Sequence, residues 1–371
     1  MSGKIVKGIK KDIFNGALKA AGPPLVALAA SLAVGGLFIL LIGENPFRVY
    51  SLLFRETFGW FDGLRFHPNW YGLGQVVFKS TTLIFTGLAV AFAFRAGLFN
   101  IGGEGQIYVG AFAMAWVGFT FTSLPFWLLV PLSLLAGMLG GALWGAIPGL
   151  LKARRGVHEV INTIMLNFIA YALIGYLVTG VFAVPATVHT PEIAPAARLA
   201  RLSALHGAFT GSLANSSFFF ALLACAAVWY LLWRTAAGYG LRAVGLSPGA
   251  AEYGGISVAK NTVLAMAISG ALAGLGGSNF VLGYKHYFEE GFSFGQGFMG
   301  IAVALLGRNH PVGVVFASIL FAALSEGGFA INILVPKELV NVLQAIIIIL
   351  VVVTASVFGD WIQKKQKNAA G

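Results

Sequence analysis

Long apolar stretches recur along the whole chain, and they constrain its fold more than any other feature. The first of them, Pro23–Ile42, contains no charged residue. A helix needs about 20 predominantly apolar residues to cross the hydrocarbon core of a bilayer. Nine more stretches follow, of which the eighth of the ten is the shortest: about Leu73–Phe94, Gln106–Thr122, Phe126–Leu151, Val160–Phe182, Phe218–Trp233, Asn261–Gly283, Phe294–Gly307, Val312–Ile331 and Leu339–Phe358. The pattern predicts an all-α polytopic membrane protein with about ten transmembrane helices.

The composition argues against the soluble classes of protein. Hydrophobic residues make up 58% of the chain and charged residues only 10%, whereas an average soluble domain is roughly 25% charged. Too few charges remain to cover a water-exposed surface, so a soluble enzyme, a nucleic-acid-binding domain and a disordered chain are all poor fits. The single cysteine, Cys225, excludes a disulfide framework, and the six histidines never fall at metal-ligand spacing.

The positive charges of the chain indicate its topology. With both termini in the cytoplasm, 16 of the 24 lysines and arginines fall on the cytoplasmic side and 8 on the other, as the positive-inside rule requires. Residues 1–22 are then expected to form a cytoplasmic amphipathic segment on anionic lipid. Residues 23–358 form the membrane domain, and residues 359–371 a cytoplasmic tail. Because the charge has this topological explanation, no nucleic-acid partner is expected.

A glycine-rich stretch, FAFRAGLFNIGGEGQ at residues 92–106, brings polar residues close to membrane depth. A carboxylate near the bilayer centre costs roughly 2.5–3.5 kcal/mol on insertion scales, so Glu104 is expected to have a purpose there. Transporters use broken helices of this kind to aim backbone dipoles at a substrate. The alternative is a cytoplasmic turn in which Arg95 and Glu104 are solvated or form an ion pair. The spacing of the residues does not separate the two interpretations.

The segment at residues 234–260 is long for a loop between spans and has room for a short helix. Ser247 is a suitable N-cap, Pro248 suits the first helical position, and Gly254 or Gly255 would end the helix. A helix of about six residues has little stability alone, so it needs a membrane domain or a partner to pack against. In ATP-driven importers such a helix docks on the ATPase. The alternative is an ordinary interfacial loop, and composition alone favours it.

Two further patterns concern helix packing and symmetry. Glycines recur every four residues at Gly137, Gly141, Gly145 and Gly149, a spacing that lets helix backbones approach closely in lipid. The second and seventh apolar stretches both end in glycine-rich breaks. Because they are five spans apart, they would be related by a faint inverted repeat, as in many transport folds.

The chain resembles a known family, the permease subunits of nucleoside and simple-sugar ABC importers. These are related to ribose and branched-chain amino acid permeases. Three stretches carry the resemblance, in matching order over roughly residues 70–330: GLFNIGGEGQ at residues 97–106, LRAVG at residues 241–245 with Ala251, Gly255 and Ile256, and IAVALLGR at residues 301–308 with Pro311. Glu326 departs from the family pattern, which has a neutral or basic residue there.

The resemblance implies a permease subunit of the plasma (inner) membrane, not an enzyme, that imports nucleosides or related simple sugars. It implies three partners: an ABC ATPase, a second permease subunit that is homologous or identical, and an extracytoplasmic substrate-binding protein. No GxxxxGK[ST] motif occurs in the chain, so the sequence predicts no cofactor here and ATP bound by the ATPase. The resemblance also implies that residues 234–260 couple to that ATPase, through Ser247, Pro248, Ala251, Glu252 and Gly255.

The substrate pathway is predicted from the chemistry of a neutral substrate with a flat base and several hydroxyl groups. Amide and aromatic side chains suit such a molecule better than fixed charges. The candidate residues are Phe99, Asn100, Glu104, Gln106, Asn162 and Asn167. Asn162 and Asn167 are five residues apart on one predicted helix, so both need not face the pathway, and packing between helices is the alternative role for each.

An ion-coupled secondary transporter of a small polar solute is the alternative function. Such a protein needs intramembrane carboxylates that carry protons or sodium ions, and only Glu104 and Glu326 are candidates. A membrane enzyme would need an acid, a base or a nucleophile grouped within the spans, and the sequence shows no such constellation.

Overall fold

The computed structural model describes residues 26, 29–63, 65–293, 295–332, 334–336, 338–346, 348–350 and 353. The predicted cytoplasmic segments 1–22 and 359–371 lie outside these residues. The chain divides into two compact units: residues 57–326 form the larger, and the described parts of residues 1–56 and 327–371 form the smaller.

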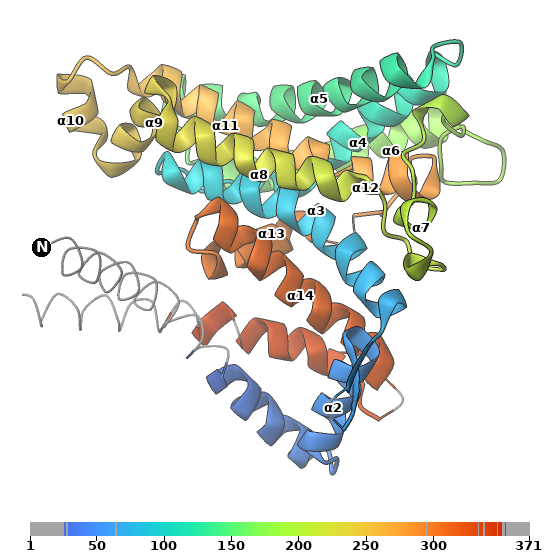
Figure 1. The fold of residues 1–371 in the computed structure, drawn as a ribbon. Coiled ribbons are helices and arrows are strands. Elements are labelled where there is room, and N and C mark those ends of the chain that lie inside the picture. Colours follow the sequence, from blue (N-terminus) through green and yellow to red (C-terminus); the bar gives the residue numbers. More distant parts are fainter. Residues whose placement is uncertain are drawn as a thin grey trace, which may run out of the picture. The chain divides into compact units, whose positions relative to one another are not determined.

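The larger unit begins with a short β-hairpin and continues almost entirely as helices (Figure 1). Strands β1 (Gly59–Asp62) and β2 (Arg65–Pro68) pair antiparallel. The main helices are α3 (Trp70–Arg95), α4 (Gly103–Thr120), α5 (Phe126–Arg155), α6 (Glu159–Tyr176), α8 (Ser217–Arg234), α9 (Ala236–Leu246), α10 (Pro248–Tyr253), α11 (Val258–Leu275), α13 (Gln296–Leu306) and α14 (Pro311–Ile331), the last of which runs into the smaller unit. The short pieces are η1 (Leu177–Val181), η2 (Pro195–Ala197), α7 (Leu202–Leu205), η3 (Gly207–Phe209), α12 (Ser278–Phe280) and η4 (Val281–Lys285).

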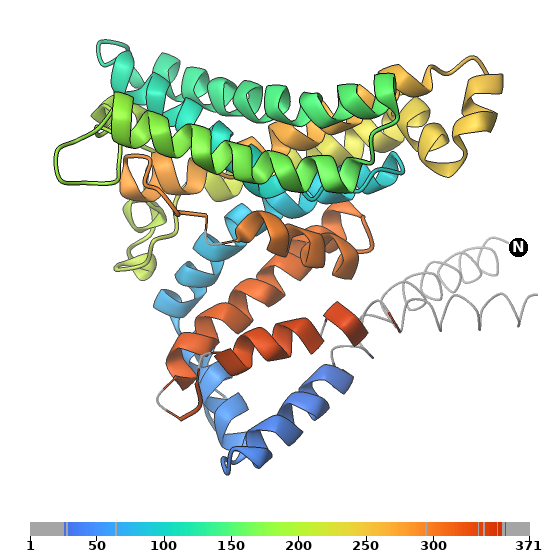
Figure 2. The same ribbon diagram turned by 180° about the vertical axis from the view of Figure 1, so that it is seen from behind.

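Helices α3 and α4 form the centre of the larger unit. Nearly all of α3 is buried, in keeping with a helix that is apolar all round. It packs against α8, α11 and α13, while α4 packs against α5, α6 and α11. Figure 1 shows α11 between α5 and α3, with α8 beside α3, and Figure 2 shows α6 beside α5 on the opposite face.

Helices α5 and α11 approach each other so closely that their backbones are in contact. A Cβ atom at Gly141 would lie 2.1 Å from the carbonyl oxygen of Gly270, and one at Gly270 would lie 2.1 Å from that of Gly141. Gly145 meets the carbonyl oxygen of Met266 in the same way, at 2.5 Å, and Gly274 meets that of Gly137, at 2.3 Å. The close helix contact that the four-residue glycine spacing predicts is therefore confirmed.

The outward faces of the peripheral helices are apolar. Large side chains are exposed on α5, α6 and α8, including Leu143 (70%), Phe168 (62%) and Leu223 (66%). An exposed apolar surface of this extent is unstable in water and stable against lipid tails. These faces fit a membrane-embedded unit whose periphery contacts lipid.

The long connection between α6 and α8 is held against η4 and the segment that follows it. The amide of Thr190 donates to the carbonyl of Phe288 (2.9 Å), that of Ile193 to His286 (2.8 Å), and that of Leu199 to Leu282 (2.8 Å). This connection is therefore an ordered layer rather than a free loop.

The smaller unit contains a sharply bent helix pair, Ala29–Leu41 and α2 (Pro46–Thr57), whose axes differ by 117°. The hydroxyl of Tyr50 in α2 donates to the carbonyl of Leu32 (2.7 Å) and joins the two arms. An apolar helix, Glu338–Leu350, lies in the same unit.

The described residues contain six helices long and apolar enough to span a membrane, or seven if the bent pair is one span. The six are Trp70–Arg95, Phe126–Arg155, Glu159–Val181, Ser217–Arg234, Val258–Lys285 and Pro311–Ile331. The all-α polytopic architecture is therefore confirmed, with the β-hairpin as an unexpected addition. The predicted stretch Gln106–Thr122 corresponds to the buried helix α4, and the predicted stretches Phe294–Gly307 and Leu339–Phe358 correspond to shorter helices. Ten spans and an inverted repeat remain predictions.

Candidate functional site

The glycine-rich break lies between α3 and α4, where the sequence predicts it. Gly97 has a φ of +73°, a left-handed conformation that glycine adopts without strain. Arg95, the last residue of α3, donates to the carbonyls of Asn309 (2.8 Å) and Arg308 (3.3 Å) and stacks on Trp233. The ion pair between Arg95 and Glu104, which the alternative interpretation allows, is not formed between these two described residues.

Asn100 is the centre of a buried polar network inside the break. Its amide nitrogen donates to the side-chain oxygens of Gln106 (2.8 Å) and Ser269 (2.8 Å), and its oxygen accepts from the amide of Gly102 (2.9 Å). The Ser269 hydroxyl in turn donates to the carbonyl of Ala89 on α3 (2.6 Å). Asn100, Gln106 and Ser269 are all at most 1% exposed. The network thus joins the break to α3, α4 and α11.

Asn167 on α6 holds the other side of the break. Its oxygen accepts from the amide of Gly105 (2.8 Å), and its nitrogen donates to the carbonyl of Ile101 (3.0 Å). One side-chain amide therefore satisfies a free donor and a free acceptor where the helix is interrupted, which a buried backbone requires.

Glu104 lies in the first turn of α4 and is 1% exposed. Its carboxylate accepts hydrogen bonds from the Ser293 hydroxyl and from the amides of Gly295 (3.1 Å) and Gly297 (2.6 Å). The position at a helix N-terminus also favours a negative charge. Glu104 therefore links Ser293, Gly295 and Gly297 to the first turn of α4 by hydrogen bonds.

The remaining two predicted pathway residues do not join this network. Phe99 is half-buried and stacks on Phe94, with ring centroids 5.1 Å apart. The side-chain nitrogen of Asn162 is buried and has no hydrogen-bond partner among the described residues. Four of the six predicted residues thus come together, and Asn162 and Asn167 face different surroundings, as their spacing allows.

Ser269 and Ser293 belong to this network but were not predicted. Both lie far along the chain from the break; Ser269 lies within a predicted apolar stretch and Ser293 directly before the next one. The one local signal is the pair Gly295 and Gly297 beside Ser293, which leaves backbone amides accessible to a carboxylate.

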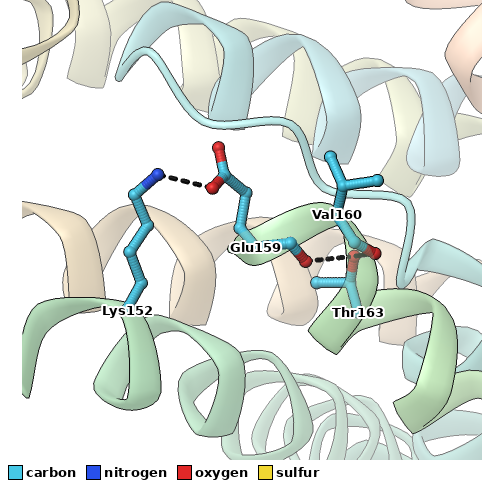
Figure 3. Close-up of polar contacts among 4 residues, drawn as sticks. All are labelled: Lys152, Glu159, Val160 and Thr163. Carbon is cyan, nitrogen blue, oxygen red and sulfur yellow. Dashed lines mark hydrogen bonds and ion pairs between the residues drawn. The ribbon is translucent and has the colours of Figure 1, made fainter. Parts of the chain in front are cut away.

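The turn between α5 and α6 is fixed by an ion pair close to the break (Figure 3). Lys152 in the last turn of α5 pairs with Glu159 in the first turn of α6. The Thr163 hydroxyl donates to the carbonyl of Glu159 (2.7 Å), and the Thr163 side chain lies against Gly102. These contacts hold the first turn of α6 beside the break, which Asn167 on the same helix also contacts.

The predicted short helix in residues 234–260 is α10. Ser247 caps it by accepting from the amide of Ala250 (3.4 Å), Pro248 is its first residue, and it ends at Gly254, followed by Gly255 with a φ of +79°. Ala251 is buried, whereas Tyr253 is 97% exposed. The local structure is confirmed.

A hollow of about 830 Å³ lies between α9, α10 and the start of α11. Its walls are formed mainly by small residues, among them Gly240, Ala243, Ala251 and Gly255. Leu246, at its edge, is 88% exposed. This end of the molecule therefore carries a recess beside large, solvent-exposed side chains.

The sequence matches the family described as branched-chain amino acid transport system / permease component, over residues 72–352. The chain belongs to this family.

Among its relatives is the guanosine ABC transporter permease protein of Bacillus subtilis, which is 40% identical over 336 residues, 88% of this chain and 92% of the relative. The nucleoside ABC transporter permease protein of Lactococcus lactis is 34% identical over 89% of this chain and 90% of the relative. The glucose ABC transporter permease protein of Haloferax volcanii is 34% identical over 90% of this chain and 87% of the relative. No solved structure matches the chain significantly. As a member of this permease family, the protein is a multi-pass component of a transporter and not itself catalytic.

Proposed function

We propose that this protein is the membrane-spanning subunit of an ABC importer that moves nucleosides, or related simple sugars, into the cell. The observation that carries the proposal is the similarity over about nine-tenths of the chain to permease proteins named for guanosine, nucleosides and glucose. Two of these three names specify nucleosides, including the relative with the higher identity. Nucleosides are therefore the preferred substrate class.

The proposed coupling segment is residues 234–260, with α10 docking on a separate ATPase through Ser247, Pro248, Ala251, Glu252 and Gly255. Support comes from the fully formed N-cap of α10 and from its exposed side chains. A six-residue helix has little stability alone, so a partner that packs on these side chains would stabilise it. The hollow beside α10 gives the ATPase a concave surface as well as a projecting one.

We propose that the break from Asn100 to Gln106 forms part of the wall of the substrate pathway. Asn100, Glu104, Gln106 and Asn167 are fully engaged in hydrogen bonds that shape this wall. Their expected role is therefore to hold irregular backbone open to the pathway, in the manner of broken transporter helices. Phe99 and Asn162, which lie outside the network, are the better candidates for direct contact with the substrate.

The proposed assembly contains a second permease subunit, homologous or identical, and an extracytoplasmic substrate-binding protein. The positive-inside distribution supports cytoplasmic termini and an even number of spans, for which ten remains our proposal. The ordered layer formed by residues 188–199 and 282–290 is the proposed platform for the binding protein, because its backbone is already fixed.

The ion-coupled alternative is disfavoured by the surroundings of its two carboxylates. Glu104 accepts three hydrogen bonds, and Glu326 forms an ion pair with Lys79 on α3, with 2.6 Å between carboxylate oxygen and ammonium nitrogen. Both carboxylates are thus held by fixed partners within the protein. A proton- or sodium-carrying group needs access to both sides of the membrane and a readily exchanged partner.

A competition experiment tests the substrate class. Cells that express the permease with its neighbouring importer subunits take up tritiated guanosine in the presence of excess unlabelled adenosine, uridine, ribose or glucose. We expect the two nucleosides to compete and the free sugars to fail. Competition by glucose alone, with no effect of either nucleoside, would replace nucleosides by sugars as the substrate.

A further inference from the structure

Helix α9 touches the break directly, backbone against backbone. A Cβ atom at Gly245 would lie 2.3 Å from the carbonyl oxygen of Arg95 and 2.9 Å from the amide nitrogen of Gly97. In the other direction, a Cβ atom at Gly97 would lie 3.0 Å from the Cα atom of Gly245. No side chain stands between the two segments at this point.

Each side of this contact continues into a different functional region. Gly245 is followed within two residues by Ser247, the cap of α10. Gly97 is followed within three residues by Asn100, which is 0% exposed and bonded to Gln106 and Ser269. The contact therefore joins the proposed ATPase-docking helix to the buried network through only a few residues on each side.

The contact is suited to transmit a displacement. Close-packed backbones lack the flexible side chains that absorb small movements, so a shift of one segment is passed to the other. The buried side chains of Leu241 and Val244 pack α9 firmly against its neighbours, so a displacement of α9 is expected to involve the whole helix.

We propose that the contact between Gly245 and Gly97 passes the movement of the coupling segment to the break in the substrate pathway. Both glycines are positioning residues: neither is expected to touch ATP or substrate. The proposal rests on the proposed function, because it needs an ATPase that moves α10.

A pair of glycine-to-alanine variants tests the proposal in the assembled importer, reconstituted in nanodiscs with its ATPase. Gly245→Ala inserts a methyl group into the contact. Gly207→Ala, in η3 and outside the coupling segment, is the matched control, because a Cβ atom there meets nothing within 4 Å. The readouts are co-purification of the ATPase, basal ATP hydrolysis, and stimulation of hydrolysis by guanosine-loaded binding protein.

We expect Gly245→Ala to retain the ATPase and basal hydrolysis but to lose stimulation by about fivefold or more, the lower range of typical coupling effects. Gly207→Ala should behave like the wild type. Normal stimulation in Gly245→Ala would overturn the proposal. If the wild type itself shows no response to guanosine, the proposed function fails instead.

A measurement on the unmodified complex decides the matter even if Gly245→Ala does not assemble. Hydrogen–deuterium exchange is compared between the nucleotide-free and the ATP–vanadate states. We expect the peptide covering residues 96–102 to change its exchange together with residues 236–253. A change confined to residues 236–253 would overturn the proposal.

Discussion

At the scale of single residues, the buried amides of the break serve the backbone. Asn167 accepts from Gly105 and donates to Ile101, whereas the side-chain nitrogen of Asn162, on the same helix, has no partner among the described residues. This contrast supports our proposal that Asn167 holds the break and that Asn162 contacts the substrate.

Replacing Asn167 by alanine is expected to lower the free energy of unfolding by about 2 kcal/mol, because a buried donor and a buried acceptor lose their partner. Asn162→Ala is the control and should leave stability within about 0.5 kcal/mol of the wild type. Thermal unfolding of the purified permease in detergent measures both. Equal losses of stability in the two variants would contradict the assignment of Asn167 to the break.

His310, in the connection between α13 and α14, predicts a dependence of stability on pH. Burial, together with the positive charge of Arg95, lowers the pKa of His310 below its usual value of 6.5. As the pH falls, the unfolded chain therefore takes up the proton first. Stability from this group is complete above about pH 6.5 and declines below it, until the pKa of the folded state is passed.

His310→Gln should weaken that acid sensitivity, since the variant has no proton to bind at this position. Unfolding temperatures between pH 5 and pH 8 measure the effect. An unchanged pH profile in the variant would show that other groups cause the acid sensitivity.

At the scale of helices, the contact between α5 and α11 depends on glycine. Gly141→Ala places a methyl group 2.1 Å from a backbone oxygen of α11, so the helices must separate and the unfolding temperature should fall sharply. Gly140→Ala is the control, because its nearest neighbour is the methyl group of Ala113 at 3.1 Å, which needs only a small shift. If both variants are equally stable, the close approach of the helices does not contribute to folding.

The coupling helix gives a prediction about assembly. Tyr253→Ala removes an exposed aromatic ring from α10 without disturbing its buried side, so we expect less ATPase to co-purify with the permease while membrane insertion is unchanged. Tyr230→Ala, which alters another exposed tyrosine (60%) on α8, should have no effect on co-purification. Normal co-purification with Tyr253→Ala would show that the Tyr253 side chain is not part of the docking surface.

Local signals predicted the elements better than the contacts between them. Ser247, Pro248 and Gly254 fix the ends of α10 through their own backbone preferences, so the helix could be located from sequence. The serines that complete the buried network lie about 165–190 residues from their partners, and the one local signal for them is the pair of glycines beside Ser293. The β-hairpin at residues 59–68 was not predicted, because it lies between the apolar stretches on which the sequence prediction rests.

At the scale of the whole molecule, apolar length alone does not show whether a helix is surrounded by protein or by lipid. Helix α4 is apolar yet enclosed by α5, α6 and α11, and it serves as the centre of the larger unit. Peripheral helices show the opposite pattern, with large apolar side chains facing outward. An apolar stretch in this sequence therefore identifies a buried environment, while its packing decides whether that environment is protein or lipid.

The central claim is that transport through this chain is driven by ATP hydrolysis on a separate subunit. Proteoliposomes that contain the permease with its second permease subunit, ATPase and binding protein should accumulate labelled guanosine only when ATP is supplied to the ATPase. Omitting the ATPase should abolish accumulation, whatever ion gradient is imposed. Accumulation by the permease alone, driven by a proton or sodium gradient, would contradict the claim.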